Sequence, residues 1–259
     1  SGMDGWLAAL TVSALSGGMT AVGAAPVLIG WRPNDRNTNA LLGFAAGVML
    51  AASFFSLIVP ALEIAEQQFG SGLIPPTIAV FGIIIGALLI ALIDRMVPHE
   101  HFVKGAEGPS GIRLNRLWLF IIAITIHNIP EGLSVGITAA GGDYDATVAI
   151  ASGIGLQNVP EGLAVALALL AIGYSRLHAF VVAGLTGAVE PLGGLLGGWF
   201  VGIADWFLPW GLLVSAGAMI FVISHEIIPE THREGHHSRA SIGLMLGLVL
   251  MLFLDVWLG

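Results

Sequence analysis

Long apolar runs separated by short polar connections dominate this chain of 259 residues. A helix needs roughly 20 apolar residues to cross the hydrocarbon core of a bilayer, which is about 30 Å thick. Eight runs reach this length, and they cover residues 5–31, 40–69, 72–97, 116–140, 145–173, 176–202, 208–231 and 240–258. The one long connection, 98–115, mixes Gly, Pro, Glu and Arg and is expected to be a mobile loop. The pattern predicts an all-α membrane protein, a single transmembrane domain of eight helices over residues 1–259.

Composition and the positions of tryptophan agree with this interpretation. Hydrophobic residues make up 56% of the chain and charged residues only 10%, whereas about a quarter of a soluble domain is charged. All seven tryptophans lie near the ends of the runs, and the indole ring favours the headgroup level of a bilayer. The formal net charge is −8 and the sequence contains no phosphate-binding loop motif. We therefore expect the lipid bilayer as a partner, and neither nucleic acid nor a nucleotide.

The distribution of basic residues predicts the orientation in the membrane. All nine Lys and Arg residues lie in or beside the connections that follow the first, third, fifth and seventh runs. The other side carries acidic residues instead, among them Asp4, Asp143 and Asp205. Cytoplasmic connections of membrane proteins are enriched in Lys and Arg, so the basic side is expected to be cytoplasmic. The loop 98–115 then faces the cytoplasm, and both termini lie outside.

The fourth and fifth runs contain two copies of one heptapeptide, 30 residues apart. Residues 127–133 read HNIPEGL, and residues 157–163 read QNVPEGL. The sixth run adds a third carboxylate at mid-depth, Glu190, which Pro191 follows. An ionisable group at the centre of a bilayer costs at least ~2.5 kcal/mol on insertion scales, so such residues are functional candidates. The proline inside each heptapeptide removes a helical hydrogen bond, and loosened backbone at this depth is typical of helices that line a cavity.

The spacing of these polar residues predicts a cation site. Residues three or four apart share a helix face, which groups His127, Asn128 and Glu131 in one run and Gln157, Asn158 and Glu161 in the next. Three close carboxylates cannot all stay ionised without a cation, and a divalent ion removes their repulsion. Oxygen and nitrogen ligands, in a chain without cysteine, suit Zn²⁺, Cd²⁺, Fe²⁺ or Mn²⁺ better than Cu⁺. The structural alternative is a hydrogen-bond network that only holds the helices together.

Taken together, the two heptapeptides and the Glu-Pro-Leu-Gly of residues 190–193 resemble the signatures of the ZIP (Zrt-/Irt-like protein) family of divalent metal transporters, in its bacterial form. Further similarity lies in FAAG at 44–47, SHEIIPE at 224–230 and FLD at 253–255. The resemblance implies an eight-helix bundle in which spans 1–3 and 6–8 form an inverted repeat around the central pair 4–5. It also implies a multi-pass protein of the plasma membrane, which is the inner membrane of such a bacterium.

The resemblance also implies the ligands of two adjacent metal ions. The central site would consist of His127, Glu131, Gln157, Glu161 and Glu190. The second site would use Asn128 and Asn158 together with the same three glutamates. In the family an acid can stand at the position of Asn158, and here it does not. Three glutamates leave a net charge of −1 with one divalent ion and +1 with two, so we expect one strong site and a weaker second one.

The resemblance and the positions of polar residues also predict the entrance and the exit of the transport path. Ser56 and Glu63 share a face of the second span and are expected on the entry path, although Glu63 also suits a solvated helix end. The expected exit residues are Asp94, His99, His101, His225 and Glu226 on the cytoplasmic side. Asp255, near the outer end of the eighth span, is expected to have a structural role.

The function that these observations favour is import of divalent metal ions into the cytoplasm, with Zn²⁺ ahead of Cd²⁺, Fe²⁺ and Mn²⁺. The metal is then the substrate, no organic cofactor is expected, and the protein is not an enzyme. The alternatives are a membrane-embedded metalloenzyme, a metal exporter and a gated channel. His225-Glu226 matches only the first half of a His-Glu-x-x-His site, because Pro229 occupies the place of the second histidine. The physiological metal, the coupling ion and the formation of a homodimer stay open.

Overall fold

The computed structural model describes residues 2–31, 33–96, 99–101, 105–107, 116–171, 174–203, 206–231, 235 and 237–258. Most of these residues are helical. The helices in chain order are α1 (Gly2–Ala24) with the 3₁₀ turn η1 (Ala25–Ile29), α2 (Asp35–Ala51), the π-helix η2 (Ala52–Ile58), α3 (Val59–Phe69), α4 (Ile74–Met96), α5 (Arg116–Ala140), α6 (Tyr144–Ala171), α7 (Arg176–Gly187), α8 (Val189–Ile203), α9 (Phe207–Val222), the π-helix η3 (Ile223–Ile227), α10 (Ile228–Thr231) and α11 (His237–Leu258).

Six helical stretches in the described part of the chain are long and apolar enough to cross a membrane. They are Asp4–Ile29, Asn39–Phe69, Ile74–Met96, Arg176–Val201, Phe207–His225 and His237–Trp257, and each coincides with one of the predicted spans. The helical membrane class is therefore confirmed. The two remaining predicted spans correspond to α5 and α6, which have 25 and 28 residues and carry the polar heptapeptides. A total of eight spans stays a prediction.

Local sequence signals account for several helix ends. The side chain of Asn34 accepts a hydrogen bond from the backbone N–H of Asn37 at the start of α2, and Ser175 caps α7 through the N–H of His178 in the same way. Gly30 ends η1 with a φ of 84°, a left-handed conformation that glycine adopts without steric strain. The connection 98–115 was predicted only as a loop. It contains a short antiparallel pair of strands, β1 (His99–His101) and β2 (Gly105–Glu107).

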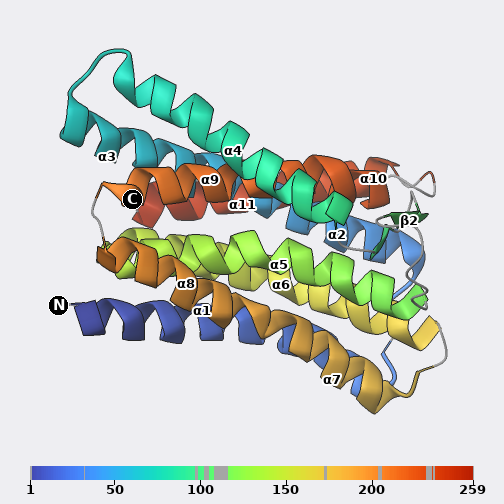
Figure 1. Ribbon diagram of the computed structural model, residues 1–259. Coiled ribbons are helices and arrows are strands. Elements are labelled where there is room, and N and C mark those ends of the chain that lie inside the picture. Colours follow the sequence, from blue (N-terminus) through green and yellow to red (C-terminus); the bar gives the residue numbers. More distant parts are fainter. Residues whose placement is uncertain are drawn as a thin grey trace.

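The helices lie side by side in a bundle, with the N- and C-termini at the same end (Figure 1). One side of the bundle contains α1, α5, α6, α7 and α8, in which α1 packs on α6 and α5 packs on α8. The other side contains α2, α3, α4, α9 and α11, in which α2 packs on α11 and α4 packs on α9. The two sides meet where α6 contacts α2 and where α5 contacts α9.

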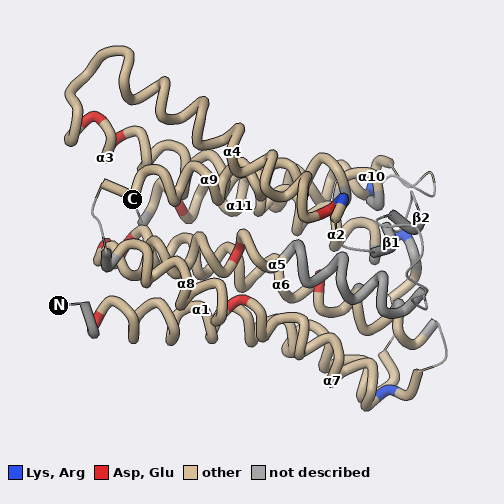
Figure 2. Tube along the Cα trace, viewed as in Figure 1, with Lys and Arg blue, Asp and Glu red and all other residues tan. Residues whose placement is uncertain are grey.

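The described basic residues lie at one end of the bundle. Figure 2 shows the described Lys and Arg positions at the end opposite the two termini, whereas acidic positions occur at both ends and partway along the helices. The positive-inside rule assigns the end that is rich in Lys and Arg to the cytoplasm. The membrane side of each end stays a prediction.

Glycine permits the close packing of α2 on α11. A methyl group at Gly43 or Gly47 of α2 would overlap with a backbone carbonyl oxygen of α11, and one at Gly243 or Gly247 of α11 would overlap with a carbonyl oxygen of α2. Small residues four apart allow backbones to approach closely in a membrane, where no hydrophobic effect drives helix association. This pair of helices is therefore held by backbone contact.

Replacing Gly47 tests this packing. In Gly47→Ala the new methyl group meets the carbonyl oxygen of Leu244, so the helices must separate at a cost of about 1–3 kcal/mol. We expect the apparent melting temperature of the purified protein to fall by several degrees. The matched control is Gly18→Ala on α1, where a methyl group has no neighbour within 4 Å among the described residues. An equal melting temperature for Gly47→Ala and the wild type would contradict the close-packing account.

Candidate metal centre

The two heptapeptides and Glu190 meet in the interior of the bundle. Glu131 lies on α5, Gln157, Asn158 and Glu161 lie on α6, and Glu190 lies in the first turn of α8. The break between α7 and α8 at Ala188 places the start of a helix here. A helix start carries partial positive charge, which favours a carboxylate in its first turn.

The glycine of each heptapeptide brings its helix against a neighbour. A methyl group at Gly132 would overlap with the backbone carbonyl oxygen of Glu190, so this glycine permits α5 to approach α8 at the acidic residue itself. Gly162 has the same role on α6, where a methyl group would overlap with the backbone of Thr20 on α1. The Pro-Glu-Gly sequence therefore combines an acidic side chain with a close helix contact at the next residue.

Amide and hydroxyl groups hold the carboxylates. Gln157 donates from Nε2 to Oε1 of Glu131. Asn158 donates from Nδ2 to Oε1 of Glu190 at 2.6 Å and to the carbonyl oxygen of Ser16 at 2.8 Å. The Ser16 hydroxyl donates to Oε2 of Glu190 at 3.1 Å. Helices α1, α5, α6 and α8 thus meet in one network of buried polar groups.

The three carboxyl groups are close enough to act on one another. Glu131 and Glu190 are fully buried and lie within hydrogen-bonding reach of each other. Glu161 is partly buried and interacts electrostatically with both. Three carboxylates in an apolar bundle repel one another strongly, because the surroundings screen charge far less than water does.

Four buried oxygen atoms of this network have no hydrogen-bond donor among the described residues. They are Oε2 of Glu131, Oε1 of Gln157, Oδ1 of Asn158 and Oε1 of Glu161. Each buried acceptor without a partner costs about 1–3 kcal/mol, and native structures contain few of them. All four are oxygen atoms of carboxylate or amide groups, which are common ligands of divalent cations.

The described side chains do not form a complete set of metal ligands in their present positions. Within the described residues, no three His, Asp or Glu side chains form a group that could hold a metal ion as they stand. The predicted ligand His127 belongs to α5, but its side chain lies outside the described ones. Asn128 is buried, and its Nδ2 donates to the carbonyl oxygen of Thr186 on α7 at 2.7 Å.

The predicted entrance residue Ser56 is paired with Asp255. The Ser56 hydroxyl lies 2.7 and 2.9 Å from the two carboxylate oxygens of Asp255, which joins η2 to α11. Ser56 is buried, whereas Glu63 on α3 is exposed. The sequence predicted an entrance role for Ser56 and a separate structural role for Asp255, and their pairing was not predicted.

The predicted exit residues Asp94 and His225 also form a pair. Nε2 of His225 in η3 lies 3.1 Å from Oδ2 of Asp94 on α4, and the imidazole stacks on the ring of Phe221 at 4.9 Å. His99 and His101 are in strand β1, and Glu226 is in η3. The side chains of these three predicted residues lie outside the described ones.

An internal match in the sequence could have revealed both pairs. Aligning Pro60 with Pro229 sets Ser56 against His225, and both lie in π-helices. The segment from Gly86 to Asp94 has the same length as that from Gly247 to Asp255, so aligning the two glycines sets Asp94 against Asp255. Sequence reasoning also missed Ser16, which is one of several hydroxyl residues in the first apolar run, and such residues usually bond to their own helix.

Comparison with known proteins identifies the family of this chain. A family profile described as "ZIP Zinc transporter" matches residues 99–255. Zinc transporter GufA of Myxococcus xanthus is 43% identical over 97% of this chain and 99% of its own length. Zinc transporter ZIPB of Bordetella bronchiseptica is 48% identical over 93% of this chain and 78% of its own length. Zinc transporter ZIP11 of Homo sapiens is 34% identical, with coverage of 93% and 94%. The profile match covers more than half of the chain and includes both heptapeptides and Glu190, and the chain belongs to the ZIP family of zinc transporters.

Proposed function

We propose that this protein imports divalent transition-metal ions into the cytoplasm through the centre between α5, α6 and α8. The relatives are named zinc transporters, which supports Zn²⁺ as the principal substrate, with Cd²⁺, Fe²⁺ and Mn²⁺ as further ones. The protein would be a multi-pass protein of the bacterial inner membrane and would need no organic cofactor.

The observation that carries the proposal is the set of four buried oxygen atoms for which the described residues supply no donor. A network that only held helices together would pair its acceptors with donors, because an unpaired buried acceptor destabilises the bundle. A divalent cation would bind oxygen atoms of this kind and would neutralise most of the repulsion among Glu131, Glu161 and Glu190. The polar centre is therefore better suited to a transported cation than to helix association alone.

Metal binding would exchange hydrogen bonds for metal–oxygen bonds. The amide nitrogen of Gln157 now donates to Glu131, and a half-turn of the amide group would present its oxygen instead. His127, one helical turn before Glu131, would add an imidazole nitrogen. Nitrogen and oxygen ligands of this kind suit tetrahedral Zn²⁺. The amide hydrogen bonds would hold the carboxylates in place between one ion and the next.

The second metal site is proposed to be weaker than the first. Asn158 is fixed by donation to Glu190 and to Ser16, and Asn128 is fixed by donation to Thr186. Neither residue brings a negative charge. A second divalent ion would leave the three glutamates with a net charge of +1 in an apolar bundle, where excess charge is costly.

The proposed topology has eight spans, both termini outside and an inverted repeat of spans 1–3 and 6–8. The two termini at one end of the bundle and the basic residues at the other support it (Figures 1 and 2). The paired contacts support the repeat, since each joins a π-helix to an aspartate near the C-terminal end of a span from the other half. Ser56 and Glu63 would lie on the entry path. The exit path would contain Asp94, His99, His101, His225 and Glu226.

Removal of one carboxylate tests the centre. In Glu161→Gln we expect Zn²⁺ uptake into proteoliposomes to fall at least about tenfold, which corresponds to the loss of about 1.4 kcal/mol of binding. The matched control is Glu66→Gln on α3, an exposed acid far along the chain from the heptapeptides, which should transport normally. Normal uptake by Glu161→Gln would refute the assignment.

The zinc content of cells that produce the protein tests the direction of transport. It should rise if the protein is an importer and fall if the protein is an exporter.

A calorimetric titration with Zn²⁺ tests the two-site proposal. We expect one strong site and a second site at least about tenfold weaker, because of the charge left by the second ion. Asn158→Asp supplies the missing negative charge and should strengthen the second site, while its metal-free form is destabilised by repulsion from Glu190. Two sites of equal affinity in the wild type would disprove the charge argument, as would a second site that Asn158→Asp leaves unchanged.

A further inference from the structure

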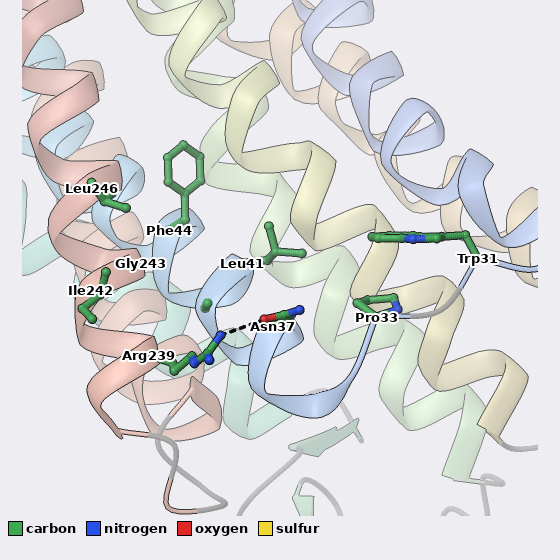
Figure 3. Close-up of a pocket in the computed structure, with 10 residues that line it drawn as sticks. Trp31, Pro33, Asn37, Leu41, Phe44, Arg239, Ile242, Gly243 and Leu246 are labelled. Carbon is green, nitrogen blue, oxygen red and sulfur yellow. Dashed lines mark hydrogen bonds between the residues drawn. The ribbon is translucent and has the colours of Figure 1, made fainter.

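A cavity of about 560 Å³ lies between the first halves of α2 and α11, away from the metal centre (Figure 3). Its size falls within the range of small-molecule sites, about 300–1,000 Å³. Leu41 and Phe44 of α2 and Ile242 and Leu246 of α11 line it with apolar surface. Trp31, in the connection between η1 and α2, closes another side.

One end of this cavity is polar and positively charged. Arg239 of α11 lies there, and its Nη1 donates to Oδ1 of Asn37 at 3.1 Å. This bond uses one of the five N–H donors of the guanidinium group. In the described part of the chain no carboxylate forms an ion pair with Arg239. A guanidinium group with spare donors and no acidic partner is suited to a phosphate group.

The cavity lies near the start of two helical stretches that are apolar enough to cross a membrane. The membrane-spanning stretches of the two helices begin at Asn39 and His237, so Arg239 is near the start of its span. Phe44 and Leu246 lie further along their helices from Arg239, within the stretches that are apolar enough to cross a membrane. Trp31 is exposed, and exposed tryptophan favours the interface. The described basic residues gather at this end of the bundle (Figure 2).

We propose that this cavity binds an anionic phospholipid of the leaflet at the basic end of the bundle. The phosphate accepts hydrogen bonds from Arg239, and one acyl chain lies along Phe44, Ile242 and Leu246. A zwitterionic lipid fills the apolar part, but its own cationic group opposes the guanidinium charge. A free phosphate ion matches Arg239 and leaves the apolar part uncovered. The bound lipid would contact α2, α11 and the connection at Trp31 together, so it should stabilise the bundle.

Thermal unfolding of the full-length protein in neutral detergent tests the lipid site. We expect added phosphatidylglycerol to raise the apparent melting temperature and phosphatidylcholine to raise it far less. Arg239→Gln should raise the phosphatidylglycerol concentration needed for half of the effect by about fivefold, the contribution of one basic residue near a membrane surface. Leu246→Trp, which fills the apolar part and keeps the charge, should also weaken the response.

The control is Arg36→Gln, an exposed basic residue at the same end that does not line the cavity, and it should respond as the wild type does. Glycerol phosphate, which has the anionic group and no acyl chain, should not stabilise the protein. The proposal fails if phosphatidylcholine or glycerol phosphate stabilises as strongly as phosphatidylglycerol. It also fails if Arg239→Gln or Leu246→Trp responds normally. None of these measurements depends on the metal centre.

Discussion

The structure depends on the burial of three carboxyl groups in a helical bundle that is otherwise largely apolar. Glu131, Glu161 and Glu190 lie close together on three helices, where water does not screen their mutual repulsion. Amide and hydroxyl donors from α1 and α6 offset part of it. Four buried oxygen atoms keep no donor among the described residues. A bound cation would stabilise a centre of this kind by offsetting the repulsion among the carboxylates.

The close packing of the helices maintains this centre. Gly132 and Gly162 follow the two central glutamates directly, and each lets its helix touch the backbone of a neighbour. The carboxylates are therefore fixed by contacts one residue away, which leaves little room for the helices to separate when the ion is absent. The same principle holds α2 against α11 through glycines at both surfaces. Glycine thus has a positional role at the polar centre as well as in the general packing of the bundle.

Much of the fold could be predicted from the sequence, because apolar runs and helix caps are local signals. The predicted spans coincide with helices, and the three glutamates lie close to one another and to Gln157 and Asn158. Asn128 instead donates to Thr186. The side chain of His127 is not described. Features that depend on contacts between distant residues were not predicted. The π-helices η2 and η3 differ from the neighbouring α-helices in their backbone hydrogen bonding, i→i+5 instead of i→i+4, which hydropathy does not report. The partners of Ser56, Asp94 and Glu190 depend on how the helices are aligned, which hydropathy does not report.

Anomalous X-ray scattering at the zinc edge, from crystals of the Zn²⁺-loaded protein, tests the central claim most directly. The account predicts the strongest anomalous peak among the carboxyl groups of Glu131, Glu161 and Glu190, with the amide oxygen of Gln157 turned toward it. A weaker second peak would lie on the side of Asn128 and Asn158. A strong peak at another site, such as Asp94 and His225, with no density among the three glutamates would contradict it.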